Sequence, residues 1–291
     1  MIQLLSSIVR NFITTQHNDT YPAIQRSCHR GHVVAITGAS SGIGKATALS
    51  FARAGVSVLA LIARRSLDEV ESTIAMAAVA AGHQAPKVLK LVADVTDESS
   101  INAAAEETKR CHGRIDVLVN NAGRVEAMSS LLDGDSHDWW RTFEVNIKGV
   151  YLTTRAFLPL LLAGGEKTVV NIGSMGAVSP IAGLSGYLSS KLALLQFSNI
   201  LTLEYGKRGL LSFTVYPGDV QTEVLGSFPD DVREYLVDTP ELPADTISWL
   251  TESRLEWLSG RFISSRWDML ELLDCRNDIV REDKLKVQMT I

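Results

Sequence analysis

Tyr187 and Lys191 stand four residues apart in the stretch Tyr187-Leu-Ser-Ser-Lys191. In a helix, side chains at this spacing lie on one face, about one turn from each other. A free tyrosine has a pKa near ~10, and a neighbouring ammonium favours the phenolate, which lowers that pKa by roughly 1 to 3 units. We therefore expect this pair to exchange a proton near neutral pH, as general acid–base catalysis requires.

Ser174 precedes Tyr187 by thirteen residues and adds a hydroxyl that can hold a substrate oxygen against the phenol. The spacing Y-x-x-x-K alone occurs often by chance, and on an amphipathic helix it marks only a surface tyrosine and a surface lysine. The catalytic interpretation therefore depends on the segments around it.

The composition is that of a globular protein and excludes several classes. The chain has 291 residues, of which 46% are hydrophobic and 21% charged, and its net charge is −5. This length allows a sizeable core. No basic run exceeds two residues and no apolar stretch reaches ~18 residues, so we predict neither nucleic-acid binding nor a membrane span.

The three cysteines, Cys28, Cys111 and Cys275, are far apart and odd in number. They predict neither a disulfide framework nor a metal site, and they fit a reducing compartment, so we expect a cytoplasmic protein. Near the N-terminus the first basic residue, Arg10, follows the apolar run, which is the wrong order for a secretory signal. We interpret residues 1–30 as an N-terminal extension.

A glycine-rich turn, Thr37-Gly-Ala-Ser-Ser-Gly-Ile-Gly44, lies between a β-branched run at 33–36 and a predicted helix at 45–54. Glycines let the backbone approach a pyrophosphate closely, and the N-terminus of the helix then faces its negative charge. The context therefore favours a dinucleotide site. The residues expected at the phosphates are Gly38, Ser40, Ser41, Gly42, Ile43 and Gly44.

The second predicted strand, 58–62, ends in Ala63-Arg64-Arg65, and no acid follows before Asp68. An acid at this point accepts the ribose hydroxyls of NAD, whereas an arginine accommodates the 2′-phosphate of NADP. We therefore predict NADP(H) as the cofactor, with Arg64 at the phosphate and Arg65 as a helper. The alternative is a solvated basic turn.

Strands and helices alternate along the rest of the chain. Further strands are predicted at 88–93, 116–119, 167–172, 211–216 and 261–263, and further helices at 67–81, 96–110, 138 onward, 187–206 and 244–258. This alternation implies an α/β fold, a Rossmann-type doubly wound parallel sheet of about seven strands in a single domain. We place that domain at residues 31–265 and a polar tail with one helix at 266–291.

Small and polar residues follow several of these strands. Asp94-Val95 closes the third strand, with a role on the adenine side favoured over that of a plain strand end. Asn120-Asn-Ala-Gly123 follows the fourth and Pro217-Gly-Asp-Val-Gln-Thr222 the sixth. Asn146 stands inside the long predicted helix that begins at Asp138, where asparagine is a poor helix former and can hold a water at a bend.

Taken together and in this order, these motifs resemble the short-chain dehydrogenase/reductase family over roughly residues 31–265. The resemblance implies a catalytic tetrad of Asn146, Ser174, Tyr187 and Lys191, with Tyr187 as the general acid of carbonyl reduction. Lys191 would also bind the nicotinamide ribose, and Asn146 would anchor a water of a proton relay. The remaining implied cofactor contacts are Asp94, Val95, Asn121, Ala122, Gly123, Pro217, Gly218, Val220 and Thr222.

Two features depart from the family pattern. The segment after the last strand lacks the usual glycine-rich turn and, with residues 20–24, is similar to fungal members that act in secondary metabolism. Asp219 is an unusual acid within the nicotinamide-side motif, and nothing in the sequence explains it. Residues 223–240, with Leu225, Phe228, Tyr235 and Leu236, suit a lid over an apolar substrate as well as an ordinary loop.

The leading interpretation is an NADPH-dependent oxidoreductase acting on a hydrophobic carbonyl compound or secondary alcohol. An epimerase or dehydratase that works through transient oxidation, or an idle NADP-binding sensor, are the alternatives, and the intact tetrad argues against the sensor. The helix at 187–206 is apolar on two faces, and a second copy of the chain can cover one of them. We therefore expect a homodimer or homotetramer.

Overall fold

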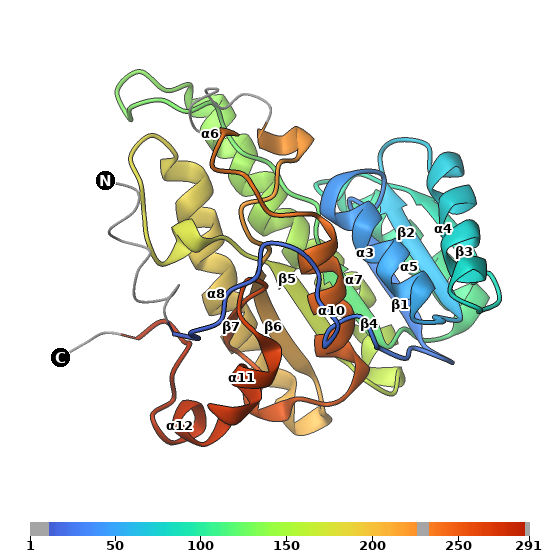
Figure 1. Ribbon diagram of the computed structural model, residues 1–291. Coiled ribbons are helices and arrows are strands. Elements are labelled where there is room, and N and C mark those ends of the chain that lie inside the picture. The colour runs from blue at the N-terminus through green and yellow to red at the C-terminus, as the bar shows by residue number, and fades with distance from the viewer. Residues whose placement is uncertain (1–11, 226–232, 289–291) are drawn as a thin grey trace.

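The computed structural model describes residues 12–225 and 233–288. Seven parallel strands form one sheet in the order β3-β2-β1-β4-β5-β6-β7, so the strand order reverses between β1 and β4. This is the doubly wound sheet that the sequence predicts (Figure 1). The strands are β1 (Val33–Thr37), β2 (Val58–Ala63), β3 (Lys87–Val92), β4 (Val117–Asn120), β5 (Thr168–Ile172), β6 (Leu211–Tyr216) and β7 (Phe262–Ser264).

Burial explains why these segments are strands. β1, β2 and β4 to β6 are short apolar or β-branched runs that are buried at every position, as strands covered on both faces must be. In the edge strand β3 only Leu91 is buried, and the strand carries Lys87 and Lys90; charges on an edge discourage pairing with another chain.

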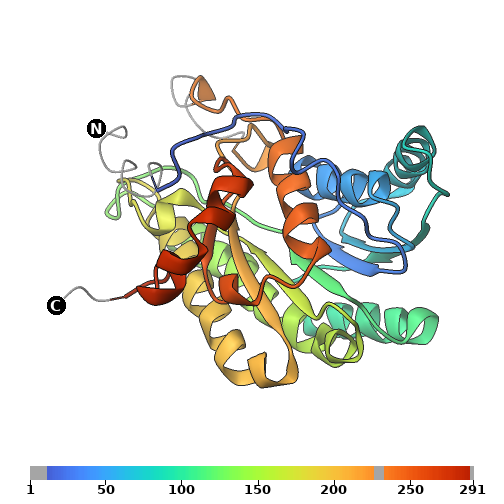
Figure 2. The same ribbon diagram turned by 60° about the horizontal axis from the view of Figure 1, so that its bottom comes forward.

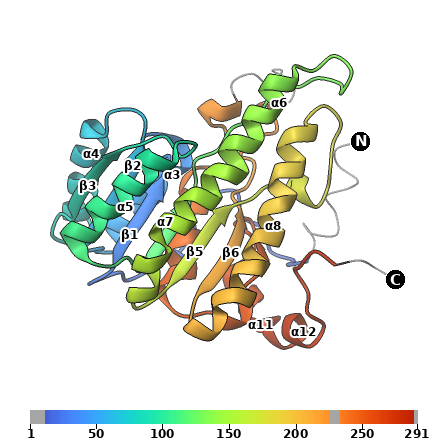
Figure 3. The ribbon, with the colours of Figure 1, turned by 180° about the vertical axis from the view of Figure 1, so that it is seen from behind.

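Helices cover both faces of the sheet. α3, α4 and α10 pack along one face, and α5, α7 and α8 lie on the other, which Figure 3 shows from behind. The α-helices are α3 (Gly42–Arg53), α4 (Asp68–Ala80), α5 (Glu98–His112), α6 (Ser136–Phe143), α7 (Gly149–Ala163), α8 (Ser185–Tyr205), α10 (Glu241–Glu252), α11 (Met269–Asp274) and α12 (Arg276–Arg281).

Three predicted helices differ from those observed. The long helix from Asp138 is interrupted by a π-helical turn, Glu144–Lys148, that holds Asn146 at its centre. The helix predicted at 244–258 ends as α10 at Glu252, because Ser253 adopts an extended conformation, and a short 3-10 turn follows. The tail holds two short helices instead of one.

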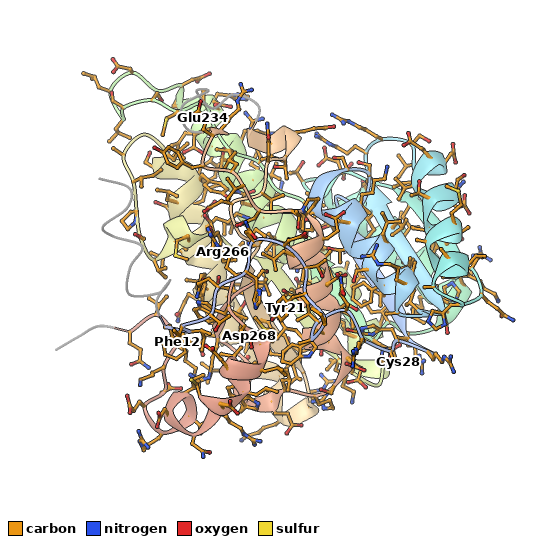
Figure 4. The ribbon with its side chains drawn as sticks, viewed as in Figure 1. Phe12, Tyr21, Cys28, Glu234, Arg266 and Asp268 are labelled. Carbon is orange, nitrogen blue, oxygen red and sulfur yellow. The ribbon has the colours of Figure 1, made fainter. Side chains whose placement is uncertain are left out.

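The N-terminal segment packs against the segment that follows β7. Residues 12–24 run beside residues 265–272, and we call this contact the terminal seam (Figures 2 and 4). Trp267 is fully buried there, and its ring is tilted by 44° against that of Phe12, at 5.4 Å between ring centroids. The Tyr21 hydroxyl accepts a hydrogen bond from the Met269 backbone at 2.8 Å. The segments outside the predicted 31–265 domain therefore contribute to the core.

Candidate active site

The carboxyl ends of the strands open into a cavity of about 1140 Å³. It extends from the glycine loop after β1, past the ends of β2, β4 and β5, to the segment after β6. All the predicted site residues line it except Gly44 and Asn146. The fold thus brings together motifs that are spread over 185 residues of sequence, from Gly38 to Thr222.

Gly44 shapes the glycine loop from behind. A Cβ atom at this position would lie 2.3 Å from the backbone oxygen of Gly38, so no other residue fits without moving the loop. The Asn121 amide donates hydrogen bonds to the backbone oxygens of Thr37 at 2.9 Å and Gly38 at 3.2 Å. Both residues therefore hold the loop in place, and Asn121 also faces the cavity.

Arg64 and Arg65 project from the end of β2 with 71% and 70% of their side chains exposed. Arg64 lies 3.8 Å from the carboxylate of Asp94, whereas Arg65 forms a 2.9 Å ion pair with Glu223, which also lines the cavity. Burial alone raises the pKa of Asp94, but hydrogen bonds from Thr96 and the charge of Arg64 outweigh it, so the pKa is lowered. Asp94 is thus an anion beside Arg64 and beside Arg141, whose guanidinium lies 3.9 Å from it.

Lys191 is almost completely buried on α8. Its ammonium donates a hydrogen bond to the backbone oxygen of Ile172 at 2.7 Å and lies 5.6 Å from the centre of the Tyr187 ring. Burial lowers the pKa of this lysine to about 8. At neutral pH Lys191 is therefore still protonated, although its burial disfavours the charged form.

The pKa of Tyr187 moves in the direction opposite to the sequence-based prediction. Burial raises it, a hydrogen bond with Ser174 opposes the rise, and the charge of Glu126 adds to it. Lys191 is not among the causes; its ammonium donates to the Ile172 backbone oxygen and lies over the Tyr187 ring. The lowering of this pKa that the sequence predicts is not observed, because burial sets its direction.

Asn146 is fully buried in the π-helical turn, behind the cavity. Its amide exchanges two 2.9 Å hydrogen bonds with the backbone of Arg124, and it donates a third to the Ser190 hydroxyl at 3.0 Å. Ser190 in turn donates to the backbone oxygen of Tyr187 at 2.7 Å. Asn146 is thus connected to the tyrosine through α8.

Arg266 explains Asp219, and sequence reasoning missed it. The Asp219 carboxylate accepts from the Tyr216 hydroxyl and pairs with Arg266 at 3.0 Å, and its backbone N–H donates to the Asp238 carboxylate at 2.6 Å. Arg266 also lies 3.7 Å from Asp238 and lines the cavity. These charges join the nicotinamide-side motif to the terminal seam, where Figure 4 labels Arg266 near Asp268. No motif in the sequence marks Arg266, because the contact spans 47 residues.

Apolar side chains dominate the cavity wall beyond the tyrosine. Val125, Leu184 and Leu188 form a small buried cluster, and Tyr187 packs against it. Tyr235 and Leu236 of the predicted lid line the cavity, whereas Phe228 and the side chain of Leu225 lie outside the described residues.

Residues 12–225 and 233–288 hold no group of three or more His, Cys, Asp or Glu residues arranged to bind a metal ion. Within the same residues, no helix combines the length and hydrophobicity needed to cross a membrane.

Comparison with known proteins gives a consistent result. A family model described as short chain dehydrogenase matches residues 32–233. A curated relative named short chain dehydrogenase andI, from Emericella variicolor, is 61% identical over 282 residues, which cover 97% of each chain. The crystal structure of levodione reductase superposes with a TM-score of 0.74 at 25% identity, covering 82% of this chain and 97% of that one. A 3-ketoacyl-(acyl-carrier-protein) reductase from Brucella melitensis, solved with NADH, gives a TM-score of 0.70 at 25% identity and covers 81% and 96%.

Proposed function

The chain belongs to the short-chain dehydrogenase/reductase family of oxidoreductases, and we propose that it is an NADPH-dependent enzyme acting on a carbonyl compound or secondary alcohol. One observation carries the proposal. The cavity that Arg64 and the glycine loop line at one end is lined by Ser174, Tyr187 and Lys191 at the other. A phosphate-binding end and a proton donor thus share one space.

The cavity fits a dinucleotide. The glycine loop lies at the N-terminus of α3, where backbone N–H groups attract phosphates. Arg64 is exposed and is our choice for the 2′-phosphate, with Arg65 as a helper. Lys191 would hold the nicotinamide ribose, and the backbone at Val220 with the Thr222 hydroxyl would hold the carboxamide. When bound, the cofactor supplies or accepts the hydride.

The protein's own part is to move one proton. In carbonyl reduction, Tyr187 donates its phenolic proton to the substrate oxygen, and the Ser174 hydroxyl stabilises the charge that develops on this oxygen. The ammonium of Lys191 donates to the Ile172 backbone and lies 5.6 Å from the centre of the Tyr187 ring, so we assign it the positioning of the cofactor beside the phenol. Asn146 fixes the helix through Ser190, and we assign it the anchoring of a water that returns the proton.

The apolar wall around Leu184, Leu188 and Leu236 favours a hydrophobic substrate. On α8, Leu192 and Leu203 remain 41% and 73% exposed, which suits a homodimer or homotetramer built on this helix. We place the enzyme in the cytoplasm and, by its resemblance to fungal members, in secondary metabolism.

A binding titration tests the cofactor. We expect wild-type protein to bind NADPH more tightly than NADH by nicotinamide fluorescence. Arg64→Ala should weaken NADPH binding by roughly 10-fold or more, because a charge-assisted hydrogen bond contributes about 1.5–3 kcal/mol, and should leave NADH binding unchanged. Arg155→Ala, at an exposed arginine paired with Glu98, is the matched control. Equal affinity for NADH in the wild type would overturn the choice of NADPH.

A turnover assay tests the reaction. Wild-type protein should oxidise NADPH in the presence of an aromatic diketone such as 9,10-phenanthrenequinone. Tyr187→Phe should lose about 10²- to 10⁴-fold in rate while it still binds NADPH, since it lacks only the proton donor. Equal rates in the two proteins would exclude Tyr187 as the acid. Binding without turnover in the wild type would favour a sensor, and epimer or alkene formation without net NADPH use would favour the epimerase or dehydratase alternative.

A further inference from the structure

Glu223 is an acid on the wall of the cavity that the proposed mechanism does not use. It follows Thr222 directly and begins the short 3-10 turn Glu223–Leu225. Its carboxylate lies 2.9 Å from the guanidinium of Arg65, which also lines the cavity, and the two residues are 158 positions apart in the sequence. This ion pair therefore connects the segment that follows β6 with the segment that follows β2.

The segment that carries Glu223 has further contacts across the cavity. Thr222 lies against the glycine loop, since a Cβ atom at Gly42 would be 3.4 Å from its methyl carbon. Earlier in the same motif, Asp219 is paired with Arg266 at 3.0 Å. The fold of this segment thus places Glu223 beside the residues that follow β2.

The two arginines after β2 have different acidic neighbours. Arg64 lies 3.8 Å from Asp94, which accepts hydrogen bonds from the backbone and the hydroxyl of Thr96 at 2.9 and 2.8 Å. Arg65 is closer to its acid, at 2.9 Å, but 70% of the Arg65 side chain and 65% of the Glu223 side chain are exposed. An exposed ion pair contributes little to stability, so Arg65 can exchange Glu223 for another anion.

The anion that suits this place is the 2′-phosphate of NADPH, and this step rests on the proposed function. A phosphate monoester carries about −1.5 to −2 charges at pH 7, so it is attracted by Arg65 and repelled by a carboxylate on the same guanidinium. NADH carries a neutral hydroxyl at the same position and meets no such repulsion. An acid beside Arg65 therefore acts against NADPH and spares NADH.

We propose that Glu223 is a specificity-determining residue that competes with the 2′-phosphate for Arg65 and thereby limits the preference of the enzyme for NADPH over NADH. Before the phosphate binds, the carboxylate neutralises Arg65, and the phosphate must replace it. The preference is thus set by three side chains, with Arg64 and Arg65 in favour of NADPH and Glu223 against it. The acid comes from the segment after β6 and not from the end of β2, where the sequence shows none.

A charge-neutral variant tests this competition. Glu223→Gln keeps the shape of the side chain and removes its charge. By nicotinamide fluorescence, we expect the variant to bind NADPH about 2- to 5-fold more tightly than wild-type protein and to bind NADH equally, because the exposed ion pair no longer has to be broken. The gain should shrink at ~1 M salt, which screens exposed charges.

Arg65→Gln completes a double-mutant cycle. In this background Glu223→Gln should lose most of its effect on NADPH binding, because the competition needs the guanidinium. Glu98→Gln, at an exposed glutamate paired with Arg155 at 2.7 Å, is the matched control and should bind both nucleotides as the wild type does. Unchanged or weaker NADPH binding in Glu223→Gln overturns the proposal, and so does an equal gain with and without Arg65.

Two nucleotides without a nicotinamide separate this proposal from the proposed function. Adenosine 2′,5′-bisphosphate and 5′-AMP differ only in the 2′-phosphate, and titration calorimetry measures their binding without turnover. Glu223→Gln should bind the bisphosphate about 2- to 5-fold more tightly and 5′-AMP equally. If wild-type protein has no preference for NADPH or reduces no diketone, the proposed function fails, and the bisphosphate titration still decides the role of Glu223. Wild-type protein that does not bind the bisphosphate overturns the role of Glu223.

Discussion

The cavity and the terminal seam differ in whether their polar side chains have compensating partners. Around the cavity, Lys191 is buried with a pKa lowered to about 8, and Glu126 leaves one oxygen unpaired. In the seam, the Asp268 carboxylate has a hydrogen-bonding partner, because His17 Nε2 lies 3.0 Å from its Oδ2. The difference teaches that the cavity keeps reactive groups at the expense of stability, whereas the seam helps to hold the fold together.

The largest expected effect is in the seam. Trp267 is fully buried between Phe12 and Phe262, so Trp267→Ala should lower the free energy of unfolding by about 3–5 kcal/mol. Urea denaturation measures this loss. Trp140 is 58% exposed on α6, and Trp140→Ala should change stability by only about 0.5 kcal/mol. Equal losses in the two variants would break the comparison.

For Lys191 in the cavity, we expect a substitution to raise the free energy of unfolding instead of lowering it. The pKa of Lys191 falls from 10.5 to about 8 on folding, so the unfolded chain binds more protons and wild-type stability rises between these pH values. Lys191→Met should therefore remove this rise and stabilise the protein by about 2–3 kcal/mol at pH 7, while it abolishes turnover.

Urea denaturation at neutral and alkaline pH measures this prediction. Lys207→Met, at an exposed lysine just beyond α8, is the matched control. If Lys191→Met destabilises the protein equally at both pH values, the burial of Lys191 does not lower the stability of the protein. The contrast with the seam then disappears.

The smallest effect is expected where the two regions meet. Arg266 joins the seam to Asp219 and Asp238, so Arg266→Ala should raise KM for NADPH several-fold, with kcat less affected and with about 1 kcal/mol of stability lost. Arg266→Lys keeps the charge but not the planar guanidinium, so it should recover only part of the affinity. Steady-state kinetics with urea denaturation of the same samples measures both quantities. An unchanged KM would confine Arg266 to the seam.

Local pattern predicted most of the architecture. The strands at 58–62 and 211–216 were predicted to within one residue. Short apolar runs between two helical patterns favour buried strands. The π-helical turn at Asn146 and the end of α10 at Glu252 could not be predicted in detail, because packing against the rest of the fold decides such interruptions. The site residues could be predicted because each belongs to a short motif that is recognisable from neighbouring residues alone.

The sequence by itself determined the doubly wound sheet and the motifs that meet at its edge, since hydrophobic period and glycine spacing act over a few residues. Only the tertiary structure decided the electrostatics of the site. Lys191 turns to Ile172, Glu126 reaches the first turn of α8, and Arg266 reaches Asp219. A pKa depends on burial and on charges brought close in space, and residues far apart in sequence supply both.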